Sequence, residues 1–228
     1  MKREASIALM LSGAVLFVMG LAAFGQGIDF APNTYNPAVG ETVTFSVCTS
    51  CTAGAVSYEW DFDGDGVSDL STADPTVEQT FDTPGYREVT LRVVGSDGRV
   101  AIRKKGILVG RSPLIGIRHV KPGPNGSLSV TIKVIAGADL SGVGIEEAIP
   151  IGWQVNATQS GGVFVKRAGS KLQVLWLNQL SEGEVATFSY DLYPAQGSGI
   201  PSFTGTISGY SKGKRTKNDL CGDLTVPQ

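Results

Sequence analysis

The sequence predicts an all-β protein built from two tandem antiparallel β-sandwiches behind an N-terminal signal helix. Three observations support this fold class. Short segments alternate apolar and polar residues with a period of two. Turn residues separate these segments, and 30 Gly and 11 Pro among 228 residues are typical of a fold with many turns. Beyond the first 25 residues, no segment has a sustained helical period.

The first block of alternating segments covers residues 27–110. Its expected strands are Glu41–Val47, Ser57–Phe62, Tyr86–Val94 and Val100–Val109. Because successive side chains of a strand point to opposite faces, Tyr58, Trp60 and Phe62 fall together on one face. Trp60 is large enough to fill the space between two sheets. Ser96-Asp97-Gly98 predicts a hairpin turn between the last two strands.

The second block covers residues 114–228 and begins with a turn cluster at Pro122–Gly126. Its later strands are expected at Leu128–Ile135, Gly144–Ala148, Gln154–Thr158, Val163–Arg167, Leu172–Leu177, Val185–Tyr193 and Phe203–Tyr210. Arg111-Ser112-Pro113 is the expected linker between the two blocks. Since this linker is short, we expect the two sandwiches to be held near each other.

The N-terminus has the features of a secretory signal. Lys2 and Arg3 form a positively charged start, and Ile7–Ala23 is an almost uncharged apolar run. Ala23-Phe24-Gly25 then places small residues before a cleavage site. We therefore expect residues 1–25 to be a cleaved signal peptide and the protein to be secreted, periplasmic or at the cell surface. The alternative is an uncleaved membrane anchor, since the apolar run is near the lower length limit of a span.

The three cysteines fit an exported protein. Cys48 and Cys51 form C-T-S-C after a strand-like segment, and a small disulfide closing a loop is the preferred interpretation. A zinc site would need four ligands, and only Cys221 and His119 remain to complete one. A redox pair usually opens a helix, whereas this pair precedes a loop. Cys221 is left over, either free or paired with one of the others.

The motifs of the first block resemble those of the PKD domain, a small immunoglobulin-like β-sandwich. The matching residues are Y-E-W-D-F-D-G-D-G at Tyr58–Gly66, Thr80-Phe81, and T-P-G-Y-R-E-V-T-L-R-V at Thr83–Val93. A Gln-Thr pair stands where the family often has a His. The resemblance implies an immunoglobulin-like sandwich over the whole block, with contacts to protein or carbohydrate at the cell surface. Tyr86 then resembles a tyrosine corner, whose ring packs while its hydroxyl bonds the backbone.

One inserted Asp distinguishes this chain from the PKD pattern and creates an acidic turn. Asp61, Asp63, Asp65 and Asp69 occupy positions 1, 3, 5 and 9 of a calcium-loop pattern. Carboxylates this close together repel unless a cation or solvent screens them, so calcium is a candidate cofactor. Position 12 is Thr72 where such loops have a bidentate Glu. The alternative is a solvated turn in which Asp61 accepts hydrogen bonds from the backbone that follows it.

The second block has a looser resemblance to the immunoglobulin-like repeats of bacterial surface proteins. The matching segments are Gly144–Trp153 and Val174–Tyr190. The resemblance implies a β-sandwich in an extracellular setting and says nothing about a ligand. We expect Trp153 and Trp176 to pack in the core or at an edge and not to form a sugar-binding platform.

No candidate catalytic residue of the sequence stands in the setting that its chemistry requires, and we predict that the protein is not an enzyme. His119 is the one histidine, and we expect it at the surface or at an interface. Glu146 and Glu147 are adjacent on a strand and therefore point to opposite faces. Ser211-x-x-Lys214 matches a nucleophile motif but lies in a basic stretch, which we expect to be a solvated loop. Its cations are Lys212, Lys214, Arg215 and Lys217, and contact with anionic polysaccharide or surface phosphates is the alternative.

Composition and motifs together predict an exported, non-catalytic binding or spacer module. The net charge of −2 provides no bulk attraction to nucleic acid. The expected partners are an extracellular protein or a polysaccharide, with membrane attachment only through an uncleaved signal segment. The alternatives are a carbohydrate-binding accessory protein of a secreted hydrolase system, and a structural component of an envelope assembly. An enzyme is the least favoured alternative.

Overall fold

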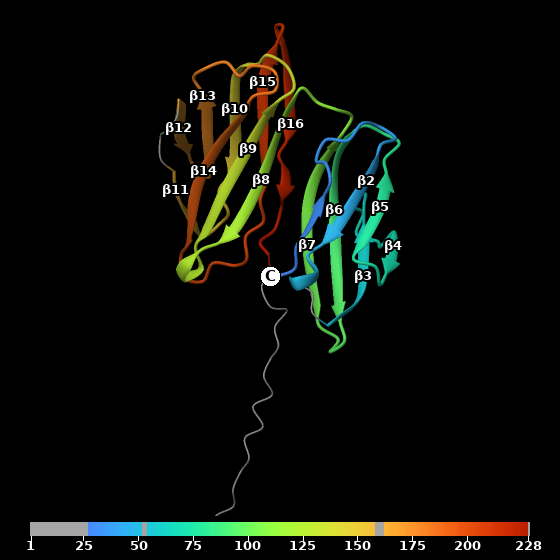
Figure 1. Ribbon diagram of the computed structural model, residues 1–228. Helices are drawn as coiled ribbons and strands as arrows, with labels where there is room; N and C mark the ends of the chain where they lie inside the picture. The colour runs from blue at the N-terminus through green and yellow to red at the C-terminus, as the bar shows by residue number, and fades with distance from the viewer. Residues whose placement is uncertain (1–26, 52–53, 158–161, 228) are drawn as a thin grey trace, which may run out of the picture.

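The computed structural model describes residues 27–51, 54–157 and 162–227 and confirms the predicted all-β fold class (Figure 1). The signal segment predicted at residues 1–25 lies outside this part of the chain. The strands of the described residues are β1 (Phe30–Pro32), β2 (Thr42–Val47), β3 (Ala55–Asp61), β4 (Leu70–Thr72), β5 (Thr76–Thr80), β6 (Gly85–Gly95), β7 (Val100–Val109), β8 (Leu114–Pro122), β9 (Leu128–Ala136), β10 (Ser141–Ala148), β11 (Trp153–Asn156), β12 (Val163–Ala168), β13 (Lys171–Trp176), β14 (Val185–Pro194), β15 (Gly205–Ser211), β16 (Lys214–Asp219) and β17 (Cys221–Asp223). Short 3-10 helices cover Thr49–Cys51 and Pro124–Gly126. In the ranges given above, no helix has the length and apolar character needed to cross a membrane.

The described strands form three sheets. A three-stranded sheet has the order β1-β2-β5, and a five-stranded sheet has the order β12-β13-β10-β15-β16. The third sheet has nine strands in the order β11-β14-β9-β8-β17-β7-β6-β3-β4, so it runs through both sandwiches. The three-stranded sheet completes the first sandwich and the five-stranded sheet completes the second.

The core of the first sandwich is centred on Trp60, as predicted. Its side chain is fully buried and its ring centroid lies 5.1 Å from Phe30 and 5.7 Å from both Phe45 and Phe62. Phe30 and Phe45 come from the three-stranded sheet, whereas Trp60 comes from the nine-stranded one. The large aromatic side chains therefore fill the space between the two layers, where they remove the most apolar surface from water.

The second sandwich has its own core, and Trp153 and Trp176 belong to it. Both indoles are buried, as the sequence predicted. Along β9, the alternation of buried Val130, Ile132 and Val134 with more exposed neighbours places one face of the strand in this core. Neither tryptophan is therefore available as a flat surface for a sugar ring.

The short strand β17 joins the two sandwiches. It pairs antiparallel with β7 of the first sandwich and parallel with β8 of the second. Gly222 sits between Gly106 on β7 and Arg118 on β8. Its φ of +82° is unfavourable for other residues, and a Cβ here would overlap the carbonyl oxygen of Arg118. Glycine at this position therefore allows β17 to fit between its two neighbours.

The two sandwiches use opposite faces of the shared sheet. Gly222 is the pairing partner of Arg118, whose side chain points into the second core. Asp223 is the pairing partner of Lys105, and Lys105 is in turn the pairing partner of Val89 in the first core. Asp223 and Val89 therefore lie on the same face of the sheet. Since successive residues of a strand point to opposite faces, the first core lies on one face of the sheet and the second core on the other. A corner therefore forms at β17, where the first sandwich ends on one face of the shared sheet and the second begins on the other.

Tyr86 resembles a tyrosine corner, as predicted, but its bond reaches the second sandwich. Its hydroxyl donates to the carbonyl oxygen of Leu220, at 3.4 Å, in the segment that leads into β17. The ring lies over Gly106, where a Cβ would overlap the Tyr86 hydroxyl. Tyr86 therefore packs its ring and bonds the backbone as predicted, and the acceptor belongs to the end of the second sandwich.

The basic stretch predicted as a loop is largely a strand. Lys214–Asp219 form β16, which pairs with β15 along its whole length. Asn218 Nδ2 donates to Ser112 Oγ and to the Leu114 carbonyl oxygen, at 2.7 Å each, and so ties this edge strand to the start of β8. Lys214, Arg215 and Lys217 therefore project from a strand and not from a loop, whereas Lys212 lies in the turn before it.

Candidate functional site

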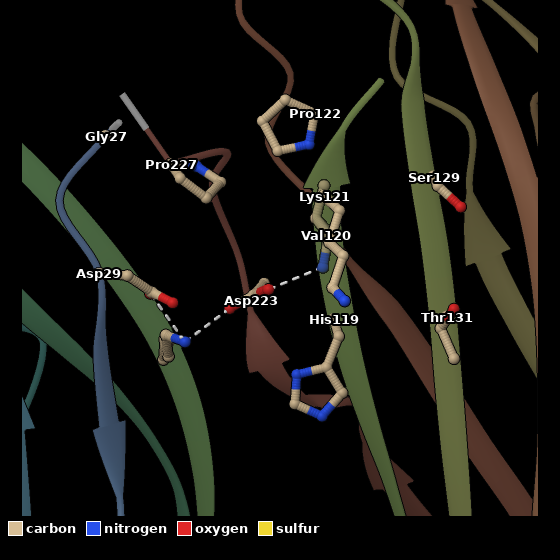
Figure 2. Close-up of a pocket in the computed structure, with 11 residues that line it drawn as sticks. Gly27, Asp29, His119, Val120, Lys121, Pro122, Ser129, Thr131, Asp223 and Pro227 are labelled. Carbon is tan, nitrogen blue, oxygen red and sulfur yellow. Dashed lines mark hydrogen bonds and ion pairs between the residues drawn. The ribbon is translucent and has the colours of Figure 1, made fainter. Parts of the chain in front are cut away.

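A groove of about 970 Å³ lies at the corner between the two sandwiches (Figure 2). Its floor is the solvent-facing side of β8 and β9, where His119 is paired with Thr131 and Lys121 with Ser129. Its wall contains Asp29 from the first sandwich, Lys105 from β7 and Asp223 from β17. Gly27, Val120, Pro122 and Pro227 complete the lining. The groove exists because both sandwiches share one sheet and turn to opposite sides of it.

The wall of the groove is a network of four charges, of which Arg103, Lys105 and Asp223 are buried and Asp29 is partly exposed. Asp223 Oδ1 lies 2.7 Å from Arg103 Nη2 and 2.9 Å from Lys105 Nζ. Asp29 Oδ1 lies 3.0 Å from Arg103 Nε and 2.9 Å from Lys105 Nζ. Asp223 Oδ2 also accepts from the backbone N–H of Val120, at 2.7 Å. Two cations and two anions thus neutralise one another, which is the condition under which charges can be buried.

A second charge pair lies on the opposite face of the sheet, inside the second core. Arg118 donates to both carboxylate oxygens of Glu147, at 2.7 Å each, and both side chains are almost fully buried. Tyr190 donates to Glu147 Oε1 at 2.9 Å, and Arg118 Nη1 donates to the Asp223 carbonyl oxygen at 3.0 Å. Asp223 therefore contacts both networks, through its side chain on one face and its carbonyl on the other. Adjacent Glu146 lies on the outer face of its strand, as predicted.

His119 lies at the junction of the two sandwiches, where the sequence placed an interface residue. Its ring makes an edge contact with Tyr35, at 6.3 Å between centroids. Burial lowers the pKa of the imidazole below its ordinary value, so it is neutral near pH 7. In the described part of the chain, no hydroxyl or carboxylate group is hydrogen-bonded to this imidazole. Ser211 and Lys214 flank the turn between β15 and β16, far along the chain from His119.

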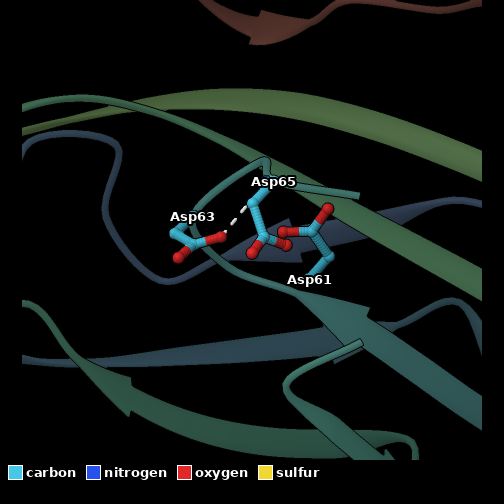
Figure 3. A group of neighbouring side chains, drawn as sticks. All are labelled: Asp61, Asp63 and Asp65. Carbon is cyan, nitrogen blue, oxygen red and sulfur yellow. Dashed lines mark hydrogen bonds between the residues drawn. The ribbon is translucent and has the colours of Figure 1, made fainter. Parts of the chain in front are cut away.

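The acidic turn brings three of the four predicted ligands together (Figure 3). Carboxylate oxygens of Asp61, Asp63 and Asp65 all lie within 4.8 Å of one another. Asp61 is buried and accepts from the backbone N–H groups of Gly64, at 2.7 Å, and Gly66, at 3.0 Å. The predicted hydrogen bonds from the following turn are therefore present. Asp69 is not part of this group, because its Oδ2 accepts from the Phe62 N–H at 2.7 Å.

The same carboxylates are acceptors for the turn itself, which limits their fit to calcium. Asp63 accepts from the Asp65 N–H at 3.1 Å, and Asp65 accepts from the Val67 N–H at 2.7 Å. Thr72, at the twelfth position, is paired in β4 with Tyr58 and supplies no carboxylate. Three converging carboxylates suit a hard cation, but the bidentate closing ligand of a calcium loop is missing. Calcium binding therefore stays a prediction.

The cysteines occupy different environments. Cys48 takes part in a disulfide, while the side chain of Cys51 lies outside the described residues. Cys221 is a free thiol on β17, fully buried in a cluster with Leu108, Ile115 and Ile117. Burial raises the pKa of this thiol to about 12, so it is protonated and unreactive at neutral pH. Cys221 thus acts as a small apolar side chain at the junction.

Comparison with known families identifies the first sandwich. The family model of the PKD domain matches residues 28–105. These residues form a PKD domain. The PKD domain of this chain therefore contributes β1 to β6 and most of β7, with Asp29, Arg103 and Lys105 of the groove wall and all four aspartates of the acidic turn. The resemblance drawn from Tyr58–Gly66 and Thr83–Val93 is confirmed.

Similar solved structures include a chitinase, a putative membrane anchored protein and fibronectin(III)-like modules. A chitinase from Bacillus thuringiensis is 10% identical with a TM-score of 0.38, over 75% of this chain and 28% of the chitinase. A putative membrane anchored protein from Corynebacterium diphtheriae is 14% identical with a TM-score of 0.30, over 87% of this chain and 57% of the other. Fibronectin(III)-like modules of CbhA from Clostridium thermocellum are 13% identical with a TM-score of 0.33, over 87% and 95%. The comparison with curated protein sequences found no match.

The charge network of the groove predicts a loss of stability in acid. Although burial of Asp29 opposes ionisation, Lys105 and Arg103 outweigh it and hold the pKa of this carboxyl below its ordinary value of 3.8. The contribution of Asp29 to stability is therefore complete above this value and declines as the pH falls below it. We expect Asp29→Asn to lower the unfolding free energy by about 1 kcal/mol near pH 7, and the difference to shrink below about pH 4. Urea unfolding across this range measures both, and a difference that stays constant into acid would contradict the assignment.

Calcium binding at the acidic turn predicts a shift in thermal stability. If the ion binds the folded PKD domain, saturating calcium raises the unfolding temperature relative to chelator, because a ligand of the native state stabilises it. Asp63→Asn with Asp65→Asn should remove this shift, whereas Asp97→Asn, at a turn outside the cluster, should retain it. Scanning calorimetry of the full chain decides the matter. Identical unfolding temperatures in calcium and in chelator would contradict calcium binding and leave the aspartates as hydrogen-bond acceptors within the turn.

Proposed function

We propose that this protein is an exported, non-catalytic binding and spacer module that makes protein–protein or protein–carbohydrate contacts at or outside the cell surface. The observation that supports the spacer role is the position of β17, which merges both sandwiches into one nine-stranded sheet. Hydrogen bonds on both sides of β17 fix the orientation of the PKD domain relative to its neighbour. A spacer needs this property, because it must hold one contact surface at a constant distance and angle from another.

The chemistry of the groove supports binding over catalysis. Its aspartates and Lys105 are committed to one another and to Arg103, so none is a free base or nucleophile. His119 is neutral near pH 7 and has no described hydrogen bond that would orient it as a general base. PKD domains are usually non-catalytic as well. The polar floor at Lys121, Ser129 and Thr131 is suited to holding a partner through hydrogen bonds.

The carbohydrate-binding alternative needs a surface other than the two tryptophans of the second sandwich. Trp153 and Trp176 are the side chains that a sugar-binding platform would use, and both are buried in the second core. Trp153 Nε1 donates to the Gly199 carbonyl oxygen at 3.2 Å, which fixes the indole in place. Any carbohydrate contact must therefore use side chains that are exposed on a sheet face or in the groove.

Co-sedimentation with the insoluble envelope fraction of the source cells tests the proposed function. We expect the purified chain without residues 1–25 to sediment with this fraction, and a soluble β-sandwich of the same net charge to stay in solution. The same preparation should not turn over chromogenic glycoside, ester or peptide substrates. Turnover that is lost in a folded His119→Ala variant would contradict the non-catalytic assignment, and failure to sediment would contradict the binding role.

A further inference from the structure

The outer face of the five-stranded sheet has a regular arrangement of exposed side chains. Strand pairing aligns one row across all five strands, which contains Phe164, Leu175, Gly144, Ser208 and Lys217. The adjacent row contains Lys166, Gln173, Glu146, Thr206 and Asp219. A third pairing places Tyr210 beside Arg215. The opposite side of this sheet is packed in the second core, so the rows face solvent. We call the surface formed by these residues and Lys171 the basic face.

The basic face has an excess of positive charge. Glu146 is already neutralised, since Lys171 Nζ lies 2.6 Å from Oε1 and Gln173 donates to Oε2 at 3.2 Å. Lys166, Arg215 and Lys217 have no ion-pair partner among the described residues. Four cations therefore face two carboxylates on a chain whose total charge is −2. Positive charge concentrated against the overall sign of the protein attracts an anionic ligand to this face.

A shallow polar hollow of about 190 Å³ lies in the middle of the basic face. It exists because Gly144 supplies no side chain at the centre of its row. A Cβ there would lie 3.1 Å from the Val174 carbonyl oxygen, so the position is also tight against the neighbouring strand. Around the hollow are the hydroxyls of Thr206 and Ser208, the amide of Gln173, the carboxylate of Glu146, which Lys171 neutralises, and the cations of Arg215 and Lys217. Its lining therefore offers hydrogen bonds and positive charge across several strands.

Exposed apolar side chains border the hollow. Phe164 and Leu175 are 47% and 42% exposed at the β12–β13 side, and Leu177 follows at the end of β13. Tyr210, which is 45% exposed, borders the other side next to Arg215. Protein interfaces usually have an apolar centre and a polar rim. The basic face differs, because its middle strands are polar, its apolar side chains Phe164 and Leu175 lie toward one edge, and Arg215 and Lys217 lie on the opposite edge strand. This arrangement suits an extended ligand with polar and charged groups along it.

We propose that the basic face binds an extended anionic polysaccharide across β13, β10, β15 and β16. Carboxylate or phosphate groups of the polymer would pair with Arg215 and Lys217, and its hydroxyls would bond Thr206, Ser208 and Gln173. The apolar faces of its sugar rings would lie against Phe164 and Tyr210. The inference deepens the proposed function, on which it rests for the class of partner, by naming the surface and the charge of the ligand.

Affinity electrophoresis and titration calorimetry with three polymers test this inference. The probes are polygalacturonate, which carries carboxylates on sugar rings, a phosphomannan, which carries phosphates on sugar rings, and neutral dextran. We expect binding to at least one polyanion, no binding to dextran, and weaker binding as salt is added. Stronger binding to one polyanion identifies the anionic group. Equal retardation by dextran, or no binding to either polyanion, would overturn the proposal.

Matched substitutions distinguish the effect of the basic face on polyanion binding from the effect of the protein's net charge. Lys217→Glu should weaken polyanion binding at least about fivefold, because it reverses a charge at the hollow. Lys133→Glu makes the same change at another exposed strand position, on β9, and should weaken binding less than about twofold. Phe164→Ala, with an unchanged unfolding midpoint, should weaken polymer binding without affecting the salt dependence. Equal effects of the two lysine variants would overturn the site.

The outcomes also distinguish this inference from the proposed function. A chain that sediments with the envelope fraction but binds no polyanion still serves as a binding module, by another surface. If the chain binds polyanions through Lys217 but does not bind the envelope fraction, the polyanion site is supported and the proposed function at the cell surface is contradicted. Lys217 is exposed on an edge strand, so its substitution leaves both cores intact.

Discussion

The placement of Asp223 between the two sandwiches is the constraint on which the rest of the structure depends. Its carboxylate is held by Arg103 and Lys105 of the PKD domain and by the Val120 N–H of the second sandwich, while its carbonyl accepts from Arg118. Buried charges of this kind are costly unless every one is paired, so the geometry tolerates little displacement. Gly222, with its positive φ, sets β17 in position for these contacts. The last strand of the chain thereby holds the first domain against the second.

This constraint explains the shape of the molecule and its surfaces. The two sandwiches share one sheet and cover opposite faces of its two halves. This arrangement leaves a groove at the junction and exposes the outer face of the five-stranded sheet. The four charges of the groove wall neutralise one another. By contrast, Lys166, Arg215 and Lys217 on the basic face have no ion-pair partner in the described chain. The first arrangement is that of a structural joint and the second that of a binding surface. A rigid joint beside an unbalanced surface charge fits a module that holds a partner at a fixed orientation.

Period-two alternation was sufficient to predict most long strands, such as Leu128–Ile135 and Val185–Tyr193, because each buries one face. It could not find β17, whose three residues include a glycine, since its pairing depends on two strands more than a hundred residues earlier. The strand at Lys214–Asp219 was missed because a sheet face exposed to solvent has no apolar alternation. At the acidic turn, spacing predicted the convergence of Asp61, Asp63 and Asp65, but not the local bond that removes Asp69. The groove required Asp29 and Asp223 to meet across the whole chain, which no local pattern reveals.

Small-angle X-ray scattering of the chain without residues 1–25 is the most direct test of the joint formed by β17. We expect the scattering curve to fit a single arrangement of the two sandwiches. Gly222→Val should increase the maximum dimension while both cores stay folded, because a side chain here overlaps the Arg118 carbonyl oxygen. Gly213→Val should not, since a Cβ at Gly213, with φ of +76°, meets nothing within 4 Å. A wild-type curve that requires many relative orientations, or a Gly222→Val curve identical to it, would contradict the claim that β17 fixes the two domains.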